Sequence, residues 1–308
     1  MRAPTLSPSG TIGLCSPSHI PLYQAAPGQE IPWSWEYKNI IAAMEKEGFA
    51  VVQAENMYKK TWGFLASDTE RAADFNQLAA DGRVEYILFG GGEGAPEVLP
   101  YLDYELFRQN PKRICSYSDG TSILNAIWAK TGLETYYGQT PSLFIDWTDY
   151  NRRHFEGHIL SDSMEVHEKN SPWQCLHSGQ AEGVLTGGYT MNFALLLGTE
   201  YFPVDLSEPH ILFLEDHQKF GGEDHVSAML GYIEQSDFMK SVCGLVFGNY
   251  ADHPCPNLYA RLKVIGERHH IPVVYCDDFG HGTNHAILPI GRRARLDTEG
   301  GLVYLQGI

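Results

Sequence analysis

The stretch RICSYSDGTSILNAIWAK, residues 113–130, predicts an abrupt passage from a short buried strand into a helix, with Ser118 at the turn. Ile114, Cys115 and Tyr117 suit a buried strand, and helix-compatible spacing of apolar residues follows the turn. In such a turn the serine hydroxyl stands clear of the sheet edge, and the following backbone N–H groups point toward the reacting centre. Ser118 is therefore a candidate nucleophile.

The neighbours of Ser118 have the size that such a turn requires. The residues two before and two after the serine must be small, and Ser116 and Gly120 meet that requirement. The usual pattern is G-x-S-x-G, and Ser116 stands where glycine is usual. A serine that only opens the helix as its N-cap is the alternative interpretation.

Two later segments contain the groups that activate a serine. The apolar run ILFLED, residues 211–216, places Glu215 at the carboxyl end of a buried strand, where open α/β sheets build their sites. His281 lies in a glycine-flanked turn after the apolar strand IPVVYC. Together with Ser118 these residues supply a nucleophile, an imidazole and a carboxylate to orient it. The chain has 13 histidines, so other neighbours compete for these roles: Asp216, His217 and His285.

A triple glycine, residues 90–92, follows the strand VEYILF. Its spacing matches neither a phosphate-binding P-loop nor a dinucleotide fingerprint. The amides of such a turn can approach a substrate carbonyl closely, so we predict an oxyanion hole formed by the N–H groups of Gly92 and Asp119. A tight turn that only needs positive φ is the alternative.

Short apolar strands alternate with helical stretches along the first half of the chain, which predicts an α/β fold. Ser67 and Glu70 have the spacing of a capping box. We predict an N-terminal α/β domain at 1–150 that carries the nucleophile, a linker at 151–180 where periodicity is lost, and a C-terminal domain at 181–308 that carries the glutamate and the histidine.

Composition narrows the possible functions. The formal net charge of -16 and the absence of a basic run argue against nucleic acid and against anionic lipid as partners. No apolar run approaches the length that crosses a bilayer, and the N-terminus lacks an apolar signal core, so we expect a cytoplasmic protein. The six cysteines are scattered without a C-x-x-C pair, which favours reduced core thiols over disulfides or a zinc site.

Motifs across nearly the whole chain resemble the LD-carboxypeptidase family of serine peptidases, which includes relatives that inactivate the antibiotic microcin C. The motifs occur in the family's order: TIGLCSPS, GGGEGAPEVLPYLDYELFRQNPK, SYSDGTSILNAIWAKTGLETYYGQTP, LTGGYTMNFALLLGTEYFP, ILFLEDH and FGHGTNHAILPIGRRARLD. The resemblance implies an N-terminal, flavodoxin-like parallel-sheet domain with a serine elbow and a smaller C-terminal α/β domain. It also implies that Ser118 is the nucleophile, that His281 is the general base, and that Glu215 orients the histidine.

The sequence departs from the family at several positions. The usual Arg-Gly-Gly-Tyr-Gly reads Gly-Gly-Gly-Glu-Gly at residues 90–94, so an arginine and a tyrosine are missing. Gly282 interrupts the usual Gly-His-Thr, and GGYTMN replaces a more usual Gly-Gly-Asn-Leu. None of these changes removes a proposed catalytic side chain, but they leave the identity of the peptide open.

The activity implied by the resemblance needs no cofactor. It is hydrolysis of the L,D-peptide bond that releases terminal D-alanine from murein tetrapeptides, as in peptidoglycan recycling, by a homodimer. One alternative is a microcin C-type peptidase that cleaves an acyl-nucleotide conjugate. A second alternative is a protein that binds peptide or nucleotide without turnover. The small substrate would lie in a cleft between the two domains. Trp33, Trp35 and Tyr37 are candidates for lining this cleft, and core packing or a surface contact is the alternative.

Overall fold

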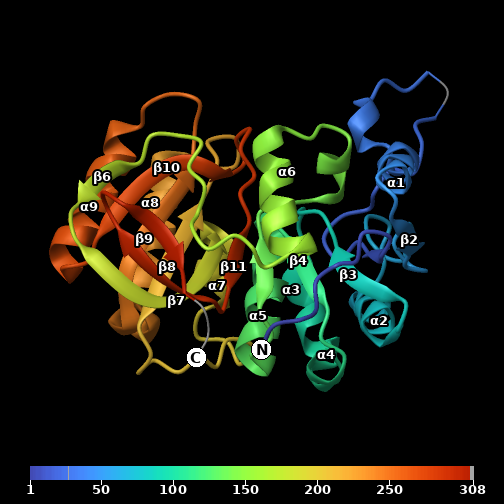
Figure 1. The fold of residues 1–308 in the computed structure, drawn as a ribbon, viewed down its shortest axis with the longest axis horizontal. Helices are drawn as coiled ribbons and strands as arrows, with labels where there is room; N and C mark the ends of the chain where they lie inside the picture. Colours follow the sequence, from blue (N-terminus) through green and yellow to red (C-terminus); the bar gives the residue numbers. More distant parts are fainter. Residues whose placement is uncertain (27, 306–308) are drawn as a thin grey trace.

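The computed structural model describes residues 1–26 and 28–305, and its strands form two sheets that lie side by side (Figure 1). The first sheet has the strand order β11-β5-β4-β3-β1-β2, and the second has the order β13-β12-β7-β8-β9-β10-β6. The predicted α/β fold with a parallel N-terminal sheet is confirmed. Within the described part of the chain, no helix has the length and apolar character needed to cross a bilayer.

Five neighbouring strands of the first sheet run parallel, in the 2-1-3-4-5 order of flavodoxin-like folds. The antiparallel strand β11 pairs with β5 at one edge. Short apolar runs between helical stretches predict the parallel strands β1 to β4. β5 and β11 have only three residues each and are not predicted. The strands are β1 (Thr11–Leu14), β2 (Ala50–Gln53), β3 (Val84–Leu88), β4 (Arg113–Ser116), β5 (Thr135–Tyr137) and β11 (Leu288–Ile290).

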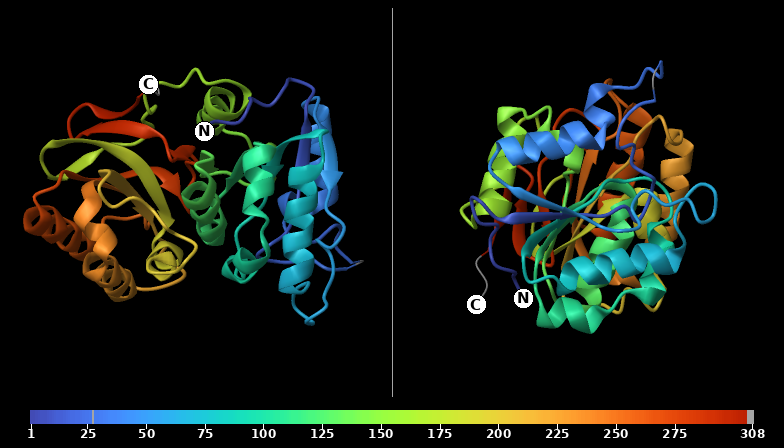
Figure 2. Two further views of the ribbon diagram at one scale, coloured as in Figure 1. Left: turned by 90° about the horizontal axis from the view of Figure 1, so that it is seen from below. Right: turned by 90° about the vertical axis from the view of Figure 1, so that its right-hand side faces the viewer.

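Helices cover both faces of the first sheet, because successive strand residues point to opposite sides (Figure 2). In β4, Ile114 packs in one hydrophobic cluster and Cys115 in the other. The Cys115 face is covered by α1 (Tyr37–Lys46). The Ile114 face is covered by α2 (Asp68–Ala80), α3 (Ala95–Val98), α4 (Tyr104–Gln109) and α5 (Thr121–Thr131). The predicted capping box is confirmed: the Glu70 N–H donates to Ser67 Oγ at 3.2 Å, and the Ser67 N–H donates to the Glu70 carboxylate at 2.9 Å.

The second sheet is parallel at its centre and antiparallel at its edges. One face is covered by α7 (Thr190–Leu196), α8 (Glu223–Gln235) and α9 (Pro256–His269) (Figure 2). Every residue of β8 is buried, as expected for the apolar run that ends at Glu215. The strands are β6 (Gln174–His177), β7 (Gln180–Tyr189), β8 (His210–Glu215), β9 (Val242–Asn249), β10 (Val273–Gly280), β12 (Arg293–Asp297) and β13 (Gly301–Tyr304).

The chain passes between the two sheets more than once. After α6 (Asp149–Phe155) and a π-helical turn, β6 joins the second sheet from within the segment predicted as a linker. Later, β11 returns to the first sheet. The division into 1–150, 151–180 and 181–308 stays a prediction.

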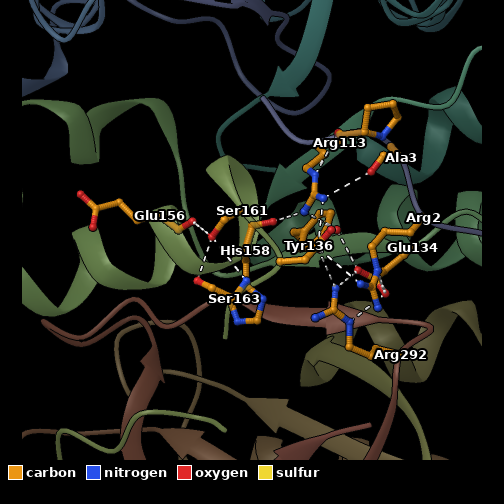
Figure 3. A network of polar contacts seen from close by, with 12 residues as sticks. Arg2, Ala3, Arg113, Glu134, Tyr136, Glu156, His158, Ser161, Ser163 and Arg292 are labelled. Atoms are coloured by element: carbon orange, nitrogen blue, oxygen red, sulfur yellow. Dashed lines mark hydrogen bonds and ion pairs between the residues drawn. The ribbon is translucent and has the colours of Figure 1, made fainter. Parts of the chain in front are cut away.

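A buried polar network ties the two sheets together beside β5 (Figure 3). Arg113 donates to the Tyr136 hydroxyl at 2.8 Å and to the backbone oxygen of His158. Arg292, which follows β11, makes a two-pronged ion pair with Glu134, with Nε 2.9 Å from Oε2. Because both guanidinium groups are buried, loss of one partner would leave an uncompensated charge, so the network fixes how the two halves meet.

Acidification is expected to destabilise the fold through His154 and His158, which are fully buried. Burial first, and neighbouring positive charge second, lowers the pKa of His158 well below 6.5 and that of His154 to about 3. The unfolded chain takes up protons on these imidazoles below pH 6.5 and the folded chain does not, so their contribution is complete above pH 6.5 and is lost as the pH falls. Each histidine should cost about 1 kcal/mol over the first pH unit below its unfolded pKa.

Denaturant unfolding of the wild type and of His158→Phe, measured at the upper and the lower end of that pH unit, tests this effect. The variant lacks one of the two groups, so its free energy of unfolding should fall by about 1 kcal/mol less than that of the wild type. Equal acid sensitivity of the two proteins would show that His158 is not responsible.

Candidate active site

Ser118 lies in the turn between β4 and α5, in a strained backbone conformation. The strand ends at Ser116, a short 3₁₀ turn spans residues 118–120, and the helix begins at Thr121. The φ angle of Ser118 is 55°, a left-handed value that is uncommon for a residue with a side chain. Such strain gathers at functional sites and is a feature of nucleophile elbows.

The packing of the turn explains why its neighbours are small. A Cβ atom on Gly120 would lie 2.3 Å from Ser116 Oγ, so a larger residue at either position would push the turn open. The hydroxyl of Thr121 donates to the Ser118 backbone oxygen at 2.6 Å and closes the turn. The close packing of Ser116 against Gly120 and the hydrogen bond from Thr121 to Ser118 therefore hold the turn in place.

His281 and Glu215 form a hydrogen-bonded pair at the ends of two central strands of the second sheet. Glu215 is the last residue of β8, and His281 directly follows β10. His281 Nδ1 lies 2.8 Å from Glu215 Oε2, and the glutamate side chain is fully buried. A carboxylate can only accept, so Nδ1 carries the hydrogen and Nε2 is left free to take a proton.

Ser118 and His281 line one cavity of about 1140 Å³, with Glu215 buried behind the histidine. The structure thus brings the three predicted residues to one place, although they come from three distant segments. The ring of Tyr117 lies 4.8 Å from that of His281, centre to centre. Among the described residues no hydrogen bond joins Ser118 Oγ to His281, and contacts of this kind are often long before substrate binds.

The surroundings of His281 favour its protonated form. Burial alone would lower the pKa of the imidazole, but the charge and hydrogen bond of Glu215, followed by the charge of Asp216, raise it above 6.5. Asp216 is buried beside this pair. Burial first, and Glu215 in addition, raises the pKa of Asp216 to about 7, although the His217 N–H donates to its carboxylate.

The competing residues are placed differently. Burial lowers the pKa of His285 to about 4, and its backbone N–H donates to Asn151 at 2.8 Å. His217 Nδ1 accepts from the Lys219 backbone N–H at 3.1 Å. Neither imidazole is hydrogen-bonded to Glu215 within the described residues. Burial raises the pKa of the Cys115 thiol to about 12, which leaves it unreactive.

The glycine turn packs directly against the elbow. A Cβ atom on Gly91 would lie 2.8 Å from Ser118 Cβ, whereas one on Gly92 would meet the backbone oxygen of Ser18 at 2.6 Å. Asp119 accepts from the Ala95 N–H at 2.7 Å, which fixes the turn to the elbow. An oxyanion hole formed by the Gly92 and Asp119 amides stays a prediction. The glycine that packs against Ser118 is Gly91.

Three residues at the site are missed by sequence reasoning. Asn192 donates to the Asp119 carboxylate at 2.7 Å, and Tyr137 donates its hydroxyl hydrogen to Glu215 Oε1. Lys219 is the only lysine or arginine among the described residues that line the cavity. All three lie within stretches quoted above or next to them, but no pattern of spacing marks them as site residues.

Aromatic and apolar side chains form much of the cavity wall. Trp35 and Phe220 line it and remain well exposed, at 64% and 61% of their surface. Trp33 is 62% exposed and is not among the lining residues, so Trp35 and Tyr37 are the two of the three candidate aromatic residues that reach the cavity. Exposed aromatic rings beside a site are suited to stacking on a planar or apolar part of a ligand.

Comparisons with known proteins agree along most of the chain. The family model for the LD-carboxypeptidase N-terminal domain matches residues 12–138, and the model for the LD-carboxypeptidase C-terminal domain matches residues 182–296. A crystal structure of an MccF-like protein from Bacillus anthracis is similar with a TM-score of 0.87 and 27% identity, covering 100% of both chains.

Three proteins that are similar to this chain have different functional descriptions. A "putative carboxypeptidase" of Treponema pallidum is 32% identical over 284 residues, covering 84% of this chain and 83% of that protein. The microcin C7 self-immunity protein MccF of Escherichia coli is 25% identical over 293 residues, covering 83% of each. A "probable murein peptide carboxypeptidase" of Bacillus subtilis is 28% identical over 254 residues, covering 78% and 77%.

Proposed function

Because this chain belongs to the LD-carboxypeptidase family of peptidases, we propose that it cleaves peptides with Ser118 as nucleophile, His281 as general base and Glu215 as the residue that orients the histidine. The observation that carries the proposal is the 2.8 Å contact between His281 Nδ1 and Glu215 Oε2, with Ser118 and His281 on the wall of one cavity. This arrangement has the parts of a serine hydrolase triad.

The proposed reaction proceeds through an acyl-enzyme. Ser118 Oγ attacks the carbonyl carbon while its proton passes to His281 Nε2, and Glu215 stabilises the imidazolium. The C–N bond then breaks as the same proton is given to the leaving amine. A water molecule attacks the ester, loses its proton to His281, and displaces Ser118 Oγ, which takes that proton back. The products are a free carboxylate and a free amine.

The developing oxyanion would be met by backbone amides of the elbow and the glycine turn. We assign this role to the Asp119 N–H and to an amide of the glycine turn, with Gly92 as the donor expected from sequence. The Asp119 carboxylate supports the assignment, because its bond to the Ala95 N–H holds the turn and the elbow in a fixed relation. Preorganised donors of this kind typically contribute about 10²- to 10³-fold to kcat each.

The proposed substrate is a murein tetrapeptide, cut at the L,D-bond that releases terminal D-alanine. A cavity of about 1140 Å³ has room for several residues. An exopeptidase must also recognise a free carboxylate, and Lys219 offers the counter-charge: its ammonium group has no hydrogen-bond or ion-pair partner among the described residues. The "probable murein peptide carboxypeptidase" among the relatives supports this choice.

Lys219→Met is expected to lower kcat/KM for the tetrapeptide by about 10- to 100-fold, because a hydrogen bond to a charged group contributes about 1.5–3 kcal/mol. Most of the loss should appear in KM. The control is Lys240→Met, which removes an exposed lysine paired with Asp237 outside the cavity and should leave both constants unchanged. Unchanged KM in Lys219→Met would exclude this lysine as the carboxylate contact.

The pH dependence of kcat/KM should show an acid limb with its midpoint above pH 6.5, because the general base must be neutral and Glu215 and Asp216 raise the pKa of His281. Activity should fall as the pH drops through this midpoint. Asp216, with its own pKa of about 7, carries part of a negative charge at this pH, so Asp216→Asn should move the midpoint to lower pH. A limb at the same pH in both proteins would contradict the role of Asp216.

A second candidate is cleavage of an acyl-nucleotide conjugate of the microcin C type. The exposed rings of Trp35 and Phe220 in the cavity wall favour it, because a nucleobase can stack on such rings. The microcin C7 self-immunity protein MccF of Escherichia coli is among the relatives. Binding of peptide or nucleotide without turnover is the remaining alternative.

Mass spectrometry of the products separates these functions. Purified wild type and Ser118→Ala are incubated in parallel with murein tetrapeptide and with an aminoacyl sulfamoyl adenosine. Loss of one D-alanine by wild type only would establish the murein activity, and cleavage of the nucleotide conjugate only would establish the second candidate. Binding of either compound without any product would support the non-catalytic alternative. Location in the cytoplasm and a homodimeric state stay predictions.

A further inference from the structure

The hydroxyl group of Tyr137 lies between the nucleophile elbow and the histidine–glutamate pair. The Ser118 backbone N–H donates to it at 2.9 Å, and the hydroxyl donates to Glu215 Oε1. The tyrosine is the last residue of β5, fully buried, and opposite Ser116 in the pairing of β4 with β5. One hydroxyl therefore contacts two of the three proposed triad residues.

The directions of these hydrogen bonds are fixed by chemistry. A backbone N–H can only donate, so the tyrosine oxygen accepts from Ser118. Its single hydrogen is then left for Glu215, whose ionised carboxylate can only accept. Burial first, and the neighbouring Glu215 second, raises the pKa of Tyr137 well above 10, so the hydroxyl keeps this hydrogen. Glu215 accepts from Tyr137 at one oxygen and from His281 at the other.

These contacts cross the boundary between the two sheets. Ser118 and Tyr137 belong to the first sheet and its elbow, whereas Glu215 ends β8 and His281 follows β10 in the second sheet. Within the described residues, no hydrogen bond joins Ser118 Oγ to His281 directly. The path from Ser118 N–H through Tyr137 and Glu215 to His281 thus connects the nucleophile elbow to the proposed base by hydrogen bonds. It lies beside two other contacts between the halves, from Asn192 to Asp119 and from the Tyr189 N–H to Thr121 Oγ1.

We propose that Tyr137 is a positioning residue that aligns the nucleophile elbow with the histidine–glutamate pair. This inference rests on the proposed function of the same site. The hydroxyl holds the Ser118 backbone on one side and the Glu215 carboxylate on the other, so the distance between serine and imidazole depends on it. Tyr137→Phe keeps the ring but removes both contacts, and a misplacement of this kind can cost about 10²-fold in rate.

Tyr136 provides a matched control on the same strand. Its hydroxyl also accepts from one donor, Arg113 at 2.8 Å, and donates to a buried carboxylate, Glu134 at 2.7 Å. It points to the opposite face of the sheet, into the network of Figure 3. Tyr136→Phe therefore removes an equivalent pair of buried hydrogen bonds away from the cavity. Both variants should lower the melting temperature, and only Tyr137→Phe should slow the chemistry.

The test uses a fluorophosphonate ester, which needs no knowledge of the natural substrate. Ser118 Oγ forms a bond to phosphorus, fluoride leaves, and the serine proton passes to His281, so the rate of adduct formation reports the activated serine. Intact-protein mass spectrometry follows this rate across pH for wild type, Tyr137→Phe and Tyr136→Phe, with Ser118→Ala as the unreactive reference.

Two changes are expected in Tyr137→Phe. The labelling rate should fall by about 10- to 100-fold. The midpoint of the acid limb should rise, because the hydroxyl hydrogen no longer offsets part of the Glu215 charge that attracts the imidazolium. The other charged or titratable groups near His281 are unchanged in this variant: Tyr117, Tyr189, Asp216, His217, Lys219 and His285.

The outcomes separate the two proposals. Wild-type protein that forms no adduct, or Ser118→Ala that forms one, would overturn the assignment of Ser118 and with it the proposed function. Rapid wild-type labelling together with an unchanged rate and midpoint in Tyr137→Phe would overturn only the role of Tyr137. An equal loss of rate in Tyr136→Phe would also overturn it, because the effect would then follow from weakened packing.

Discussion

Ser118→Ala should lower kcat by about 10⁴- to 10⁶-fold on whichever substrate the wild type cleaves, the largest effect expected of any single change. The variant removes the atom that forms the acyl-enzyme, and the residual rate would come from binding and the oxyanion donors. A variant that keeps even a tenth of the wild-type rate would exclude Ser118 as the nucleophile.

The fold should survive this change. Ser118 Oγ has no hydrogen-bond partner among the described residues, and alanine meets the same backbone strain at φ 55° as serine. The melting temperature of Ser118→Ala should therefore stay close to that of the wild type. Ser142→Ala is a suitable control, because Ser142 also lines the cavity and, within the part of the chain that the structure describes, its hydroxyl bonds only to Thr140 Oγ1, 3.0 Å away. Its kcat should be unaffected.

Glu215→Gln should lower kcat by about 10⁴-fold while leaving the shape of the site intact. The amide oxygen can still accept the Tyr137 hydroxyl hydrogen, which leaves the amide N–H₂ facing His281 Nδ1. An N–H donor at that position forces the imidazole to carry its hydrogen on Nε2, where the serine proton must be received. The variant should bind substrate normally and turn it over very slowly.

Glu134→Gln is the matched control for Glu215→Gln. Glu134 is also a buried carboxylate that accepts from a tyrosine and from a cationic side chain, but it lies in the network of Arg292 and outside the cavity. Its loss should reduce the free energy of unfolding and leave kcat near the wild-type value. If both glutamine variants lost kcat by the same factor, the effect of Glu215→Gln would be one of stability.

Much of the fold follows from local patterns. The strands β1, β3, β4 and β8 are marked by runs of apolar residues, and the start of α2 is marked by its capping box, because burial and capping act over a few neighbouring residues. The strands that escape prediction have weak local signals. β5 and β11 have three residues each, and β7 contains Gly183, Gly187 and Gly188.

The glycines of β7 show why such a strand is hard to predict. A Cβ atom on Gly188 would lie 2.4 Å from Thr121 Oγ1, at the start of α5. The same Thr121 oxygen accepts from the Tyr189 backbone N–H at 2.9 Å. Gly188 is small because a helix from the other half of the chain packs against the strand, whereas a Cβ atom on Gly183 or Gly187 would meet the backbone oxygen of Pro209 or Phe213. That requirement is tertiary and leaves no periodicity in the sequence.

The sequence by itself determined the α/β class, the elbow at Ser118 and the strand end at Glu215, because each depends on a short run of neighbouring residues. With the family motifs it also pointed to His281. Only the tertiary structure decided that β11 returns to the first sheet, that Gly91 packs against the nucleophile, that Lys219 lines the cavity, and that Tyr137 joins the two halves of the site. These features depend on the distance and direction between side chains far apart in the chain, which local propensity and spacing do not encode.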